Sequence, residues 1–584
     1  MAIPPKYKPF LNSLKLTPLA KMLLEKRYLL KDVNNQICET PEEMFYRVAK
    51  NIALADKPYE EEIEQTEEKF FKALISQEIV PASPILMSAG GRLQFLFSDH
   101  ALEVSDSLEN IFETLKIAAT IQQHGGGVGF NFSNIRPRFD EVSGLKNVAF
   151  GPLSVMKIFD TSFSAILQGG RRPGANMAVL SISHPDIEQY IEAKAELNQL
   201  SNFNLSIAIT NEFMEAVLEN KPFNLINPRN NKITKTINAK ELFRKISQYA
   251  WGTGDPGILF IDEFNEKYPF ENRKIICTGS CGQYGFESYE GVPYAHINLT
   301  KIIKEENNQK QLDLEKLKDL THTAVHFLDN CIDMHRFSNN LIEQQSKSVR
   351  KIGLGVMGFA DLLFNFKIPY GSEESLNMAK EIMKFIKKES RKASKQLAFR
   401  RGTFPAYGQS TLDDPSRNAT ITSIAPTGTT SILTGVSQSI EPVYALSYTT
   451  KTASGEEFTI LNNEFKQELE KLKLTANERV QLQFVDSISN ISWLDQNIKD
   501  TFKTSHDVIP EEHLKVMATF QKYVDNAISK TINLPNDASI EDVEEIFIKA
   551  YKLKCKGVTI YRDGCRDDQV LTNKRQTKLY AFNS

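Results

Sequence analysis

The first 80 residues carry apolar side chains at helical spacing. The segment TPEE at 40–43 combines an N-cap threonine, a proline at the first helical position and a glutamate that can complete a capping box. Met44, Val48 and Ile52 then recur every four residues, which places them on one face of a helix. The pattern predicts a small helical N-terminal domain over residues 1–80.

The apolar pattern changes after this point. Short apolar runs alternate with longer helical stretches, and the clearest of these runs are GVGFNF, NMAVLSI, NLSIAIT and GILFI. Such alternation is typical of parallel strands joined by crossover helices. We expect one large α/β domain over residues 81–570, with a polar helical insertion at about 450–530. A flexible basic tail is expected to follow at 571–584.

Composition and charge narrow the classes of function. Of the 584 residues 41% are hydrophobic and 24% are charged, and the formal net charge is −3. There is no basic excess to attract a nucleic acid polymer. No run approaches a membrane span, and the N-terminus does not resemble a signal peptide. Six cysteines are too sparse for a disulfide framework, so we expect a reduced, cytoplasmic protein.

The segment IAPTGTTSILTGV at 424–436 is the best candidate for a phosphate-binding loop. A strand-like stretch precedes it and a helix can begin within it. The N-terminus of that helix would offer backbone N–H groups and hydroxyls to a phosphate. The candidate contacts are Thr427, Gly428, Thr429, Thr430 and Ser431. A plain strand-to-helix turn with capping hydroxyls explains the same residues about equally well.

Other glycine-rich segments are less specific. HGGGVGFNFSNIRP at 124–137 and GGRRPGANMAV at 169–179 would let a ligand approach bare backbone closely. The segment 353–358 matches the dinucleotide pattern G-x-G-x-x-G, but no βαβ context surrounds it. We therefore interpret its glycines as close-packing positions.

Two cysteines, Cys277 and Cys281, lie in CTGSCGQYGFESYEGVPYAHINL, a stretch rich in small residues. No second Cys or His pair stands at ligand spacing, so a structural zinc site is not expected. Cys281 is followed by glycine in a loop that leads towards a strand. Such a turn can present a sulfur atom into a cavity.

Taken together, the motifs resemble those of ribonucleotide reductases, specifically the class II, adenosylcobalamin-dependent kind. The ordered matches span nearly the whole chain and include PASPILMSAGG, SDSLENIF, GGGVGFNFSNIRP, GGRRPGANMAVL, KIGLGVMGFADLL, APTGTTSILTGVSQSIEPVY, DNAISKTINLPND and YRDGCRDDQVL. The resemblance implies a ten-stranded α/β barrel whose central finger loop carries a radical cysteine, here Cys281. In this family the cysteine becomes a thiyl radical and removes the 3′-hydrogen of a ribonucleotide.

The chain departs from the family at the positions that carry out the reduction. The family's finger-loop Asn and Glu are here Gly279 and Gln283, and an amide cannot act as a general base. The reducing cysteine pair falls on Asp99 and Val292. No cysteine follows Cys565 in the sequence, so a reducing tail like that of relatives is not expected.

These departures leave three hypotheses. The first is a thiyl-radical enzyme without thiol-driven reduction, with redox-neutral ribose chemistry such as epimerisation. The second is a reductase with another reductant, either formate or Cys277 as a substitute thiol. The third is a non-catalytic nucleotide-binding paralogue. For the first, the sequence leaves the acid–base group open among five residues: Asp99, His100, Glu287, Glu290 and His296.

The resemblance also implies binding residues and partners. Ser83 and Asn131 are expected to line the substrate pocket, and a ribonucleoside di- or triphosphate is the expected substrate. Cobalt arrives with adenosylcobalamin, so no side chain is expected to ligate a metal. A homodimer is expected because dimers are common in the family.

Overall fold

The structure, a computed structural model, describes residues 3–168, 172–196, 199–451, 457–483 and 485–565. The predicted tail at 571–584 lies outside these residues, as does part of the loop at 169–176. Among the described helices, none is both long and apolar enough to cross a lipid bilayer.

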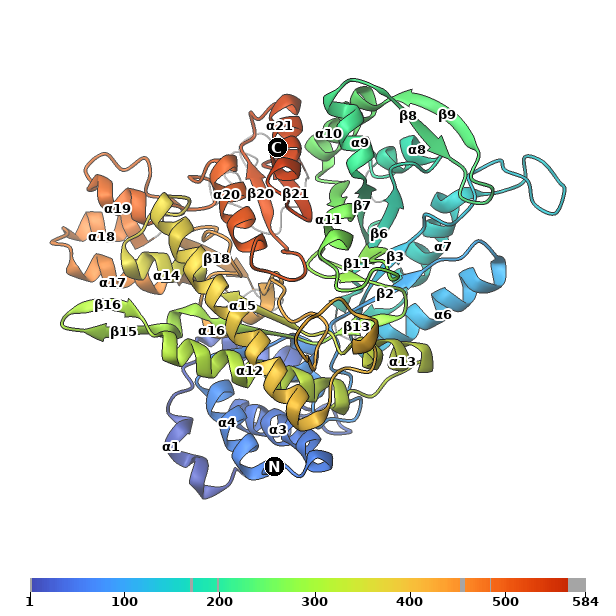
Figure 1. Ribbon diagram of the computed structural model, residues 1–584. Coiled ribbons are helices and arrows are strands. Elements are labelled where there is room, and N and C mark those ends of the chain that lie inside the picture. The colour runs from blue at the N-terminus through green and yellow to red at the C-terminus, as the bar shows by residue number, and fades with distance from the viewer. Residues whose placement is uncertain (1–2, 169–171, 197–198, 452–456, 484, 566–584) are drawn as a thin grey trace.

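Helices make up the start of the chain (Figure 1). They are α1 (Lys8–Leu11), α2 (Pro18–Leu23), α3 (Pro41–Ala53), α4 (Ile63–Ile75) and, after the short strand β1 (Ile79–Pro81), α5 (Ser83–Ser88). The expected capping box is present, because the Thr40 hydroxyl accepts from the Glu43 N–H and the Glu43 carboxylate accepts from the Thr40 N–H. The amphipathic helix expected at this point is confirmed.

Five parallel strands form the first half of a barrel. They follow one another in the order β2 (Asp99–Glu103), β3 (Gly127–Asn131), β6 (Asn176–Ser181), β7 (Phe203–Ile209) and β10 (Gly257–Phe260). The connections contain α6 (Leu108–His124), α7 (Gly151–Ser164), α8 (Ile187–Glu192), α9 (Asn211–Leu218) and α10 (Ala239–Thr253). A hairpin of β8 (Pro222–Ile226) and β9 (Ile233–Asn238) extends from α9. All four apolar runs singled out in the sequence lie on these strands.

The second half is built from β14 (Tyr294–Asn298), β17 (Gly353–Met357), two extended segments and β21 (Gly557–Arg562). Bridges from Leu354 to Thr422 and from Ile424 to Ile528 link the segment 420–424 to its neighbours. The second extended segment, which contains Ile528, continues into β20 (Thr531–Leu534), and β20 is parallel to β21. The expected strand before the phosphate-loop candidate is thus present only as isolated bridges.

The two halves meet on both sides. Strand β10 pairs antiparallel with β21, and β13 (Glu290–Val292) pairs antiparallel with β2 before the chain continues into β14. Five strands in each half give the ten-stranded α/β barrel that the resemblance implies, which is confirmed.

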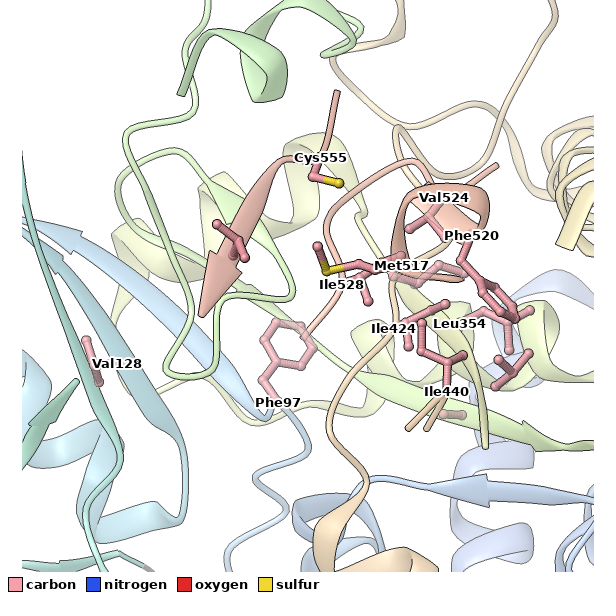
Figure 2. Close-up of a cluster of buried hydrophobic side chains, with 14 of the residues drawn as sticks. Phe97, Val128, Leu354, Ile424, Ile440, Met517, Phe520, Val524, Ile528 and Cys555 are labelled. Carbon is pink, nitrogen blue, oxygen red and sulfur yellow. The ribbon is translucent and has the colours of Figure 1, made fainter. Parts of the chain in front are cut away.

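Helices of the second half cover the outside of the barrel. The main ones are α12 (Leu314–Met334), α13 (Asn340–Val349), α14 (Phe359–Phe366), α15 (Glu373–Arg401), α20 (Pro510–Gln521) and α21 (Ile540–Lys552). Figure 2 shows α20 inserting Met517 and Phe520 beside Leu354, Ile424 and Ile528. Burying these side chains removes their apolar surface from water and fixes α20 on the barrel wall.

The polar segment near 450–530 has a small core of its own. It contains α17 (Asn463–Lys471), α18 (Ala476–Gln483) and α19 (Gln496–Thr501). Phe465, Leu482 and Phe502 pack with Phe364 of α14 in a cluster separate from the main core. The insertion is therefore attached to the barrel through α14.

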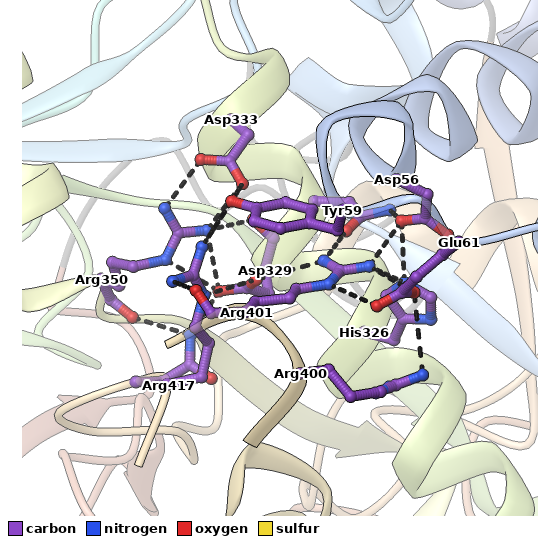
Figure 3. Close-up of polar contacts among 12 residues, drawn as sticks. Asp56, Tyr59, Glu61, His326, Asp329, Asp333, Arg350, Arg400, Arg401 and Arg417 are labelled. Carbon is purple, nitrogen blue, oxygen red and sulfur yellow. Dashed lines mark hydrogen bonds and ion pairs between the residues drawn. The ribbon is translucent and has the colours of Figure 1, made fainter. Parts of the chain in front are cut away.

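A buried charge cluster joins the N-terminal helices to α12 and α15 (Figure 3). Arg401 is 2.6 Å from Asp56 and 2.8 Å from Glu61, and His326 is 3.0 Å from Asp56. Asp56, Glu61 and His326 lie close enough to share a cation. The guanidinium of Arg401 supplies that positive charge, so the arrangement is an ion-pair cluster that ties the helical region to the barrel.

Candidate active site

A short hairpin occupies the interior of the barrel. Its strands are β11 (Cys277–Thr278) and β12 (Gly285–Phe286). Glycines on the inner face of β3 make room for it: a Cβ atom at Gly129 would lie 1.8 Å from the carbonyl oxygen of Thr278. A Cβ atom at Gly127 would lie 2.9 Å from Ser280 Oγ. These two positions accept only glycine without displacing the hairpin.

Residues of both barrel halves hold the hairpin. Asn204 of β7 donates a side-chain hydrogen bond of 3.0 Å to the Ser280 carbonyl. From the other half, the Ala527 N–H and the Ser423 hydroxyl donate to the Gln283 carbonyl, at 3.1 and 2.9 Å. The hairpin is therefore the finger loop that the resemblance implies, and its tip is anchored on two sides.

Cys281 lies at the tip of this hairpin and is exposed. Gly282 follows it with a φ of +79°, and a Cβ atom there would meet nothing within 4 Å. Cys277 is different: it is fully buried, and burial raises the pKa of its thiol well above the usual value. Because a thiolate is needed for thiol–disulfide exchange, Cys277 is unsuited to the role of substitute reducing thiol.

Asp99 binds the hairpin directly. One carboxylate oxygen accepts from the Ser280 N–H at 3.1 Å and from the Ser280 hydroxyl at 2.7 Å, and the other accepts from Gln283 Nε2 at 2.5 Å. A Cβ atom at Gly279 would lie 2.8 Å from Asp99 Cβ and Cγ. The space that a side chain at position 279 would occupy is thus taken by Asp99.

Asp99 and Val292 are direct Cα partners across the β2–β13 ladder. The structure therefore brings together the two positions that the resemblance assigns to the reducing pair. A carboxylate and a valine stand there, and neither can form or break a disulfide. The tyrosine two residues beyond Val292, Tyr294, is buried, and its pKa is raised first by this burial and then by the nearby Asp99 carboxylate.

Three of the five acid–base candidates are unsuited by their positions. His100 faces outward from β2, since neighbouring side chains on a strand alternate, and it stacks on Phe95. Glu287 accepts from Arg273 at 2.8 Å, and Glu290 pairs with Lys351 at 2.6 Å. Both carboxylates are therefore engaged away from the hairpin tip.

The phosphate-loop candidate begins the short helix α16 (Gly428–Thr434). Thr427 precedes it in the left-handed region, and its hydroxyl accepts from the Ser439 N–H at 2.8 Å. The hydroxyls of Thr430 and Ser431 donate to carbonyls of their own turn. Three of the five candidates thus have structural roles for their side chains, which leaves the backbone of Gly428 and Thr429 as the accessible part.

The two remaining candidates lie at the edges of the barrel. Ser83 is at the start of α5, and its hydroxyl is 2.7 Å from that of Tyr28. Asn131 ends β3, and its side-chain oxygen accepts from the Ser133 N–H at 3.0 Å. No hydrogen bond joins either side chain to the hairpin among the described residues, and their place in the substrate pocket stays a prediction.

Sequence reasoning missed three residues that position the site: Asn204, Ser280 and Ser423. Each acts through a contact between segments far apart in the chain. Only Ser280 carried a signal, because it adjoins Cys281 where a hydroxyl can reach the neighbouring strand.

Comparisons with known proteins agree with this geometry. The chain matches the family model for the ribonucleotide reductase barrel domain over residues 98–416 and 411–561. It matches the all-alpha domain of ribonucleotide reductase over residues 14–94.

Curated relatives and solved structures point the same way. The chain is 39% identical to the vitamin B12-dependent ribonucleoside-diphosphate reductase of Thermoplasma acidophilum, over 96% of this chain and 81% of that protein. It is 37% identical to the Mycobacterium tuberculosis protein of the same name, over 98% of this chain and 82% of that one. A class Id ribonucleotide reductase alpha subunit from Actinobacillus ureae shares the fold, with a TM-score of 0.77 at 21% identity, covering 94% of this chain and 97% of that one. The chain belongs to the ribonucleotide reductase family.

Proposed function

We propose that this chain is a radical enzyme in which Cys281 becomes a thiyl radical and abstracts the 3′-hydrogen of a ribonucleotide. The observation that carries the proposal is the position of this cysteine. Its side chain is exposed at the tip of a hairpin that both barrel halves hold inside the barrel. A fixed, accessible sulfur atom is what hydrogen abstraction at a defined carbon requires.

Adenosylcobalamin is the proposed cofactor, by analogy with the B12-dependent relatives. The residues at the tip fit such a group, because Cys281 is exposed and the space beside Gly282 is open. When bound, the cofactor supplies one-electron oxidising power through its weak cobalt–carbon bond. The chain positions the thiol that receives it and shields the radical within the barrel.

The proposed reaction does not use a thiol pair as the reductant. Asp99 and Val292 occupy the two positions where such a pair would stand, and Cys277 is buried. Redox-neutral chemistry at the ribose, such as epimerisation, is compatible with these residues. It returns a hydrogen atom to the sugar without a net supply of electrons.

A ribonucleoside di- or triphosphate is the proposed substrate. Its phosphates would contact the backbone N–H groups at the start of α16, where Gly428 and Thr429 are partly exposed. Ser423 lies five residues before Gly428 and donates to the hairpin, so this turn and the radical cysteine are linked through one short segment. Ser83 and Asn131 are proposed to line the sugar side of the pocket.

A second candidate is a reductase that uses an external reductant such as formate. The favouring observation is the 39% identity to a protein named as a reductase. Product mass separates the two reactions, because reduction to a deoxynucleotide removes one oxygen atom and epimerisation leaves the mass unchanged.

The decisive experiment incubates the chain with ribonucleotides and adenosylcobalamin carrying tritium at its 5′ carbon. We expect tritium release into water in the wild type and none in Cys281→Ser. Tyr294→Phe serves as a neighbouring control that keeps the thiol. Absence of tritium release in the wild type would favour a non-catalytic nucleotide-binding paralogue.

A homodimer and a cytoplasmic location complete the proposal. We propose that the dimer interface lies over α6, the segment 139–150 and α7, which carry the exposed apolar side chains of Leu108, Phe112, Phe139, Val142, Leu145, Val148, Phe150 and Ile158. A surface of this kind commonly marks a protein–protein interface. Sedimentation velocity should show a dimer that Phe112→Glu weakens, whereas Phe399→Glu, at another exposed site, should leave it unchanged.

A further inference from the structure

Buried polar atoms without a hydrogen-bond partner are rare in folded proteins, and each one calls for an explanation. The atoms of the described residues that lack a hydrogen bond of normal geometry include Gln283 Oε1 and both ring nitrogens of His296. Each of these side chains is 2% exposed. Both belong to the barrel interior, so their unused hydrogen-bonding capacity faces the site and not the outer helices.

The position of His296 follows from its strand. It pairs with Val80 of β1 on one side and with Gly355 of β17 on the other. A Cβ atom at Gly355 would lie 2.4 Å from the Ser423 carbonyl oxygen and 3.1 Å from His296 Cδ2. Since the Ser423 hydroxyl donates to the Gln283 carbonyl, the imidazole lies on the side of the hairpin that Ser423 covers.

The orientation of β14 confirms this placement. Ala295 and Ile297 belong to the core beneath the outer helices, whereas Tyr294 packs with residues of the hairpin. Side chains alternate along a strand, so His296 shares the inner face with Tyr294. The glycine at 355 opposite the ring keeps this part of the interior from being filled by a side chain.

The chemistry of the ring suits a hydroxyl group. Burial lowers the pKa of His296 to about 4, against an opposing effect of the Val80 backbone, so the imidazole is neutral near pH 7. One nitrogen of a neutral imidazole donates and the other accepts. A hydroxyl can accept a hydrogen bond from the one nitrogen or donate one to the other. An ionised phosphate can only accept hydrogen bonds.

Asp99 is the remaining acid–base candidate, and its carboxylate already accepts three hydrogen bonds from the hairpin. Its role is to position the finger loop. Glu290 also has a carboxylate oxygen without a partner, but Lys351 holds the other oxygen of that carboxylate in an ion pair. His296 is then the one neutral inward-facing group of the original five in which every polar side-chain atom lacks a hydrogen bond.

This inference rests on the proposed function and adds a residue to it. We infer that His296 binds a ribose hydroxyl of the substrate and accepts its proton, replacing the carboxylate that the family has at position 283. The proton moves from the hydroxyl oxygen to the accepting ring nitrogen. The electron pair stays on the sugar oxygen, and the ring becomes an imidazolium until it returns the proton.

The variant His296→Gln tests this role, because glutamine keeps hydrogen-bonding capacity but cannot take up a proton. Hydrogen exchange between solvent and the substrate sugar should fall about 100-fold, in line with the usual contribution of a general base. Tritium release from the cofactor, which depends on Cys281, should stay within about twofold of the wild type.

His100→Gln is the matched control, since it makes the same change on the outward face of β2. It should leave the exchange per folded molecule unchanged. Substrate exchange in His296→Gln above half of the wild-type rate overturns the inference while leaving the proposed function intact. Loss of tritium release in the wild type overturns the proposed function itself.

A measurement on the wild-type chain does not depend on how the variant folds. With ¹⁵N-labelled histidine and no cofactor, one buried imidazole signal should shift on addition of a ribonucleotide. The 2′,3′-dideoxynucleotide with the same base and phosphates should not produce this shift. Equal shifts with both nucleotides, or none with either, contradict contact between His296 and a ribose hydroxyl.

Discussion

Asp99 on β2 and Val292 on β13 face each other as direct partners across an antiparallel ladder. The family resemblance placed a reducing cysteine pair at these two positions from sequence alone, and the strand register agrees with that alignment. The fold has therefore kept the geometry of the pair while the chain has lost its chemistry.

The first prediction follows from this register. In Asp99→Cys/Val292→Cys the two thiols should form a disulfide under mild oxidation, because the Cα atoms of direct antiparallel partners lie within the range that a disulfide spans. Peptide mapping by mass spectrometry detects the bond. The pair Ala101→Cys/Val292→Cys is diagonal in the ladder and should cross-link poorly, so equal yields in the two variants would contradict the register.

The second prediction concerns the role of Asp99 in holding the finger loop. Asp99→Ala removes the acceptor of three hydrogen bonds and should lower the free energy of unfolding by about 1 to 3 kcal/mol. Urea denaturation measures this change. Iodoacetamide should also modify Cys281 faster in the variant, while the exposed Cys38, far away in the sequence, should react at an unchanged rate.

The third prediction tests whether Gly279 and Asp99 depend on each other. Gly279→Ala should destabilise the chain by about 1 to 3 kcal/mol, since its Cβ would lie 2.8 Å from Asp99. In the Asp99→Gly background the same change should cost much less. A double-mutant cycle by urea denaturation gives the coupling, and additive effects would show that the two positions are independent.

The fourth prediction concerns the buried charge cluster of Figure 3. Asp329 is fully buried and lies within ion-pair distance of Arg350, Arg401 and Arg417. Asp329→Asn leaves several buried guanidinium groups without their shared anion and should cost about 3 to 5 kcal/mol. Asp333→Asn, at a partly exposed position, should cost less. A smaller effect for Asp329 than for Asp333 would contradict this order.

The fifth prediction is the pH dependence of the same cluster. Burial alone would raise the pKa of Asp329, but Arg350, Arg417 and Arg401 lower it overall. A carboxyl whose pKa is lower in the folded state adds stability above its unfolded value, near pH 4, and loses it as the pH falls. The denaturation midpoint should decline below about pH 4, and this decline should be shallower in Asp329→Asn. Identical profiles would exclude a contribution from Asp329.

Much of the barrel could be predicted because its signal is local. Apolar runs such as GVGFNF report burial on both faces of a strand, and each of the four runs lies on a barrel strand. The strand-like stretch before the phosphate-loop candidate makes only isolated bridges, because the Asp525 side chain accepts hydrogen bonds from the N–H groups of Ile421 and Thr422. Competition of that kind depends on tertiary contacts and leaves no periodic pattern.

The candidate site could likewise be predicted only in part. Cys281 and the Asp99–Val292 positions were recognisable from motifs, whereas the choice among five acid–base candidates was not. That choice depends on which face of a strand each residue occupies and on whether a distant cation neutralises it, as Lys351 does for Glu290. The spacing of residues in the sequence predicts neither the strand face nor the distant cation.

Gly127, Gly129, Gly353 and Gly355 line the barrel where the hairpin and its neighbours approach most closely, and side chains at these positions would displace them. The space in which the hairpin places the sulfur is thereby set by glycines of the barrel wall, together with the hydrogen bonds that hold the loop. Evolution can exchange the residues around a thiol held in this way, and so alter the outcome of a radical reaction, without moving the radical itself.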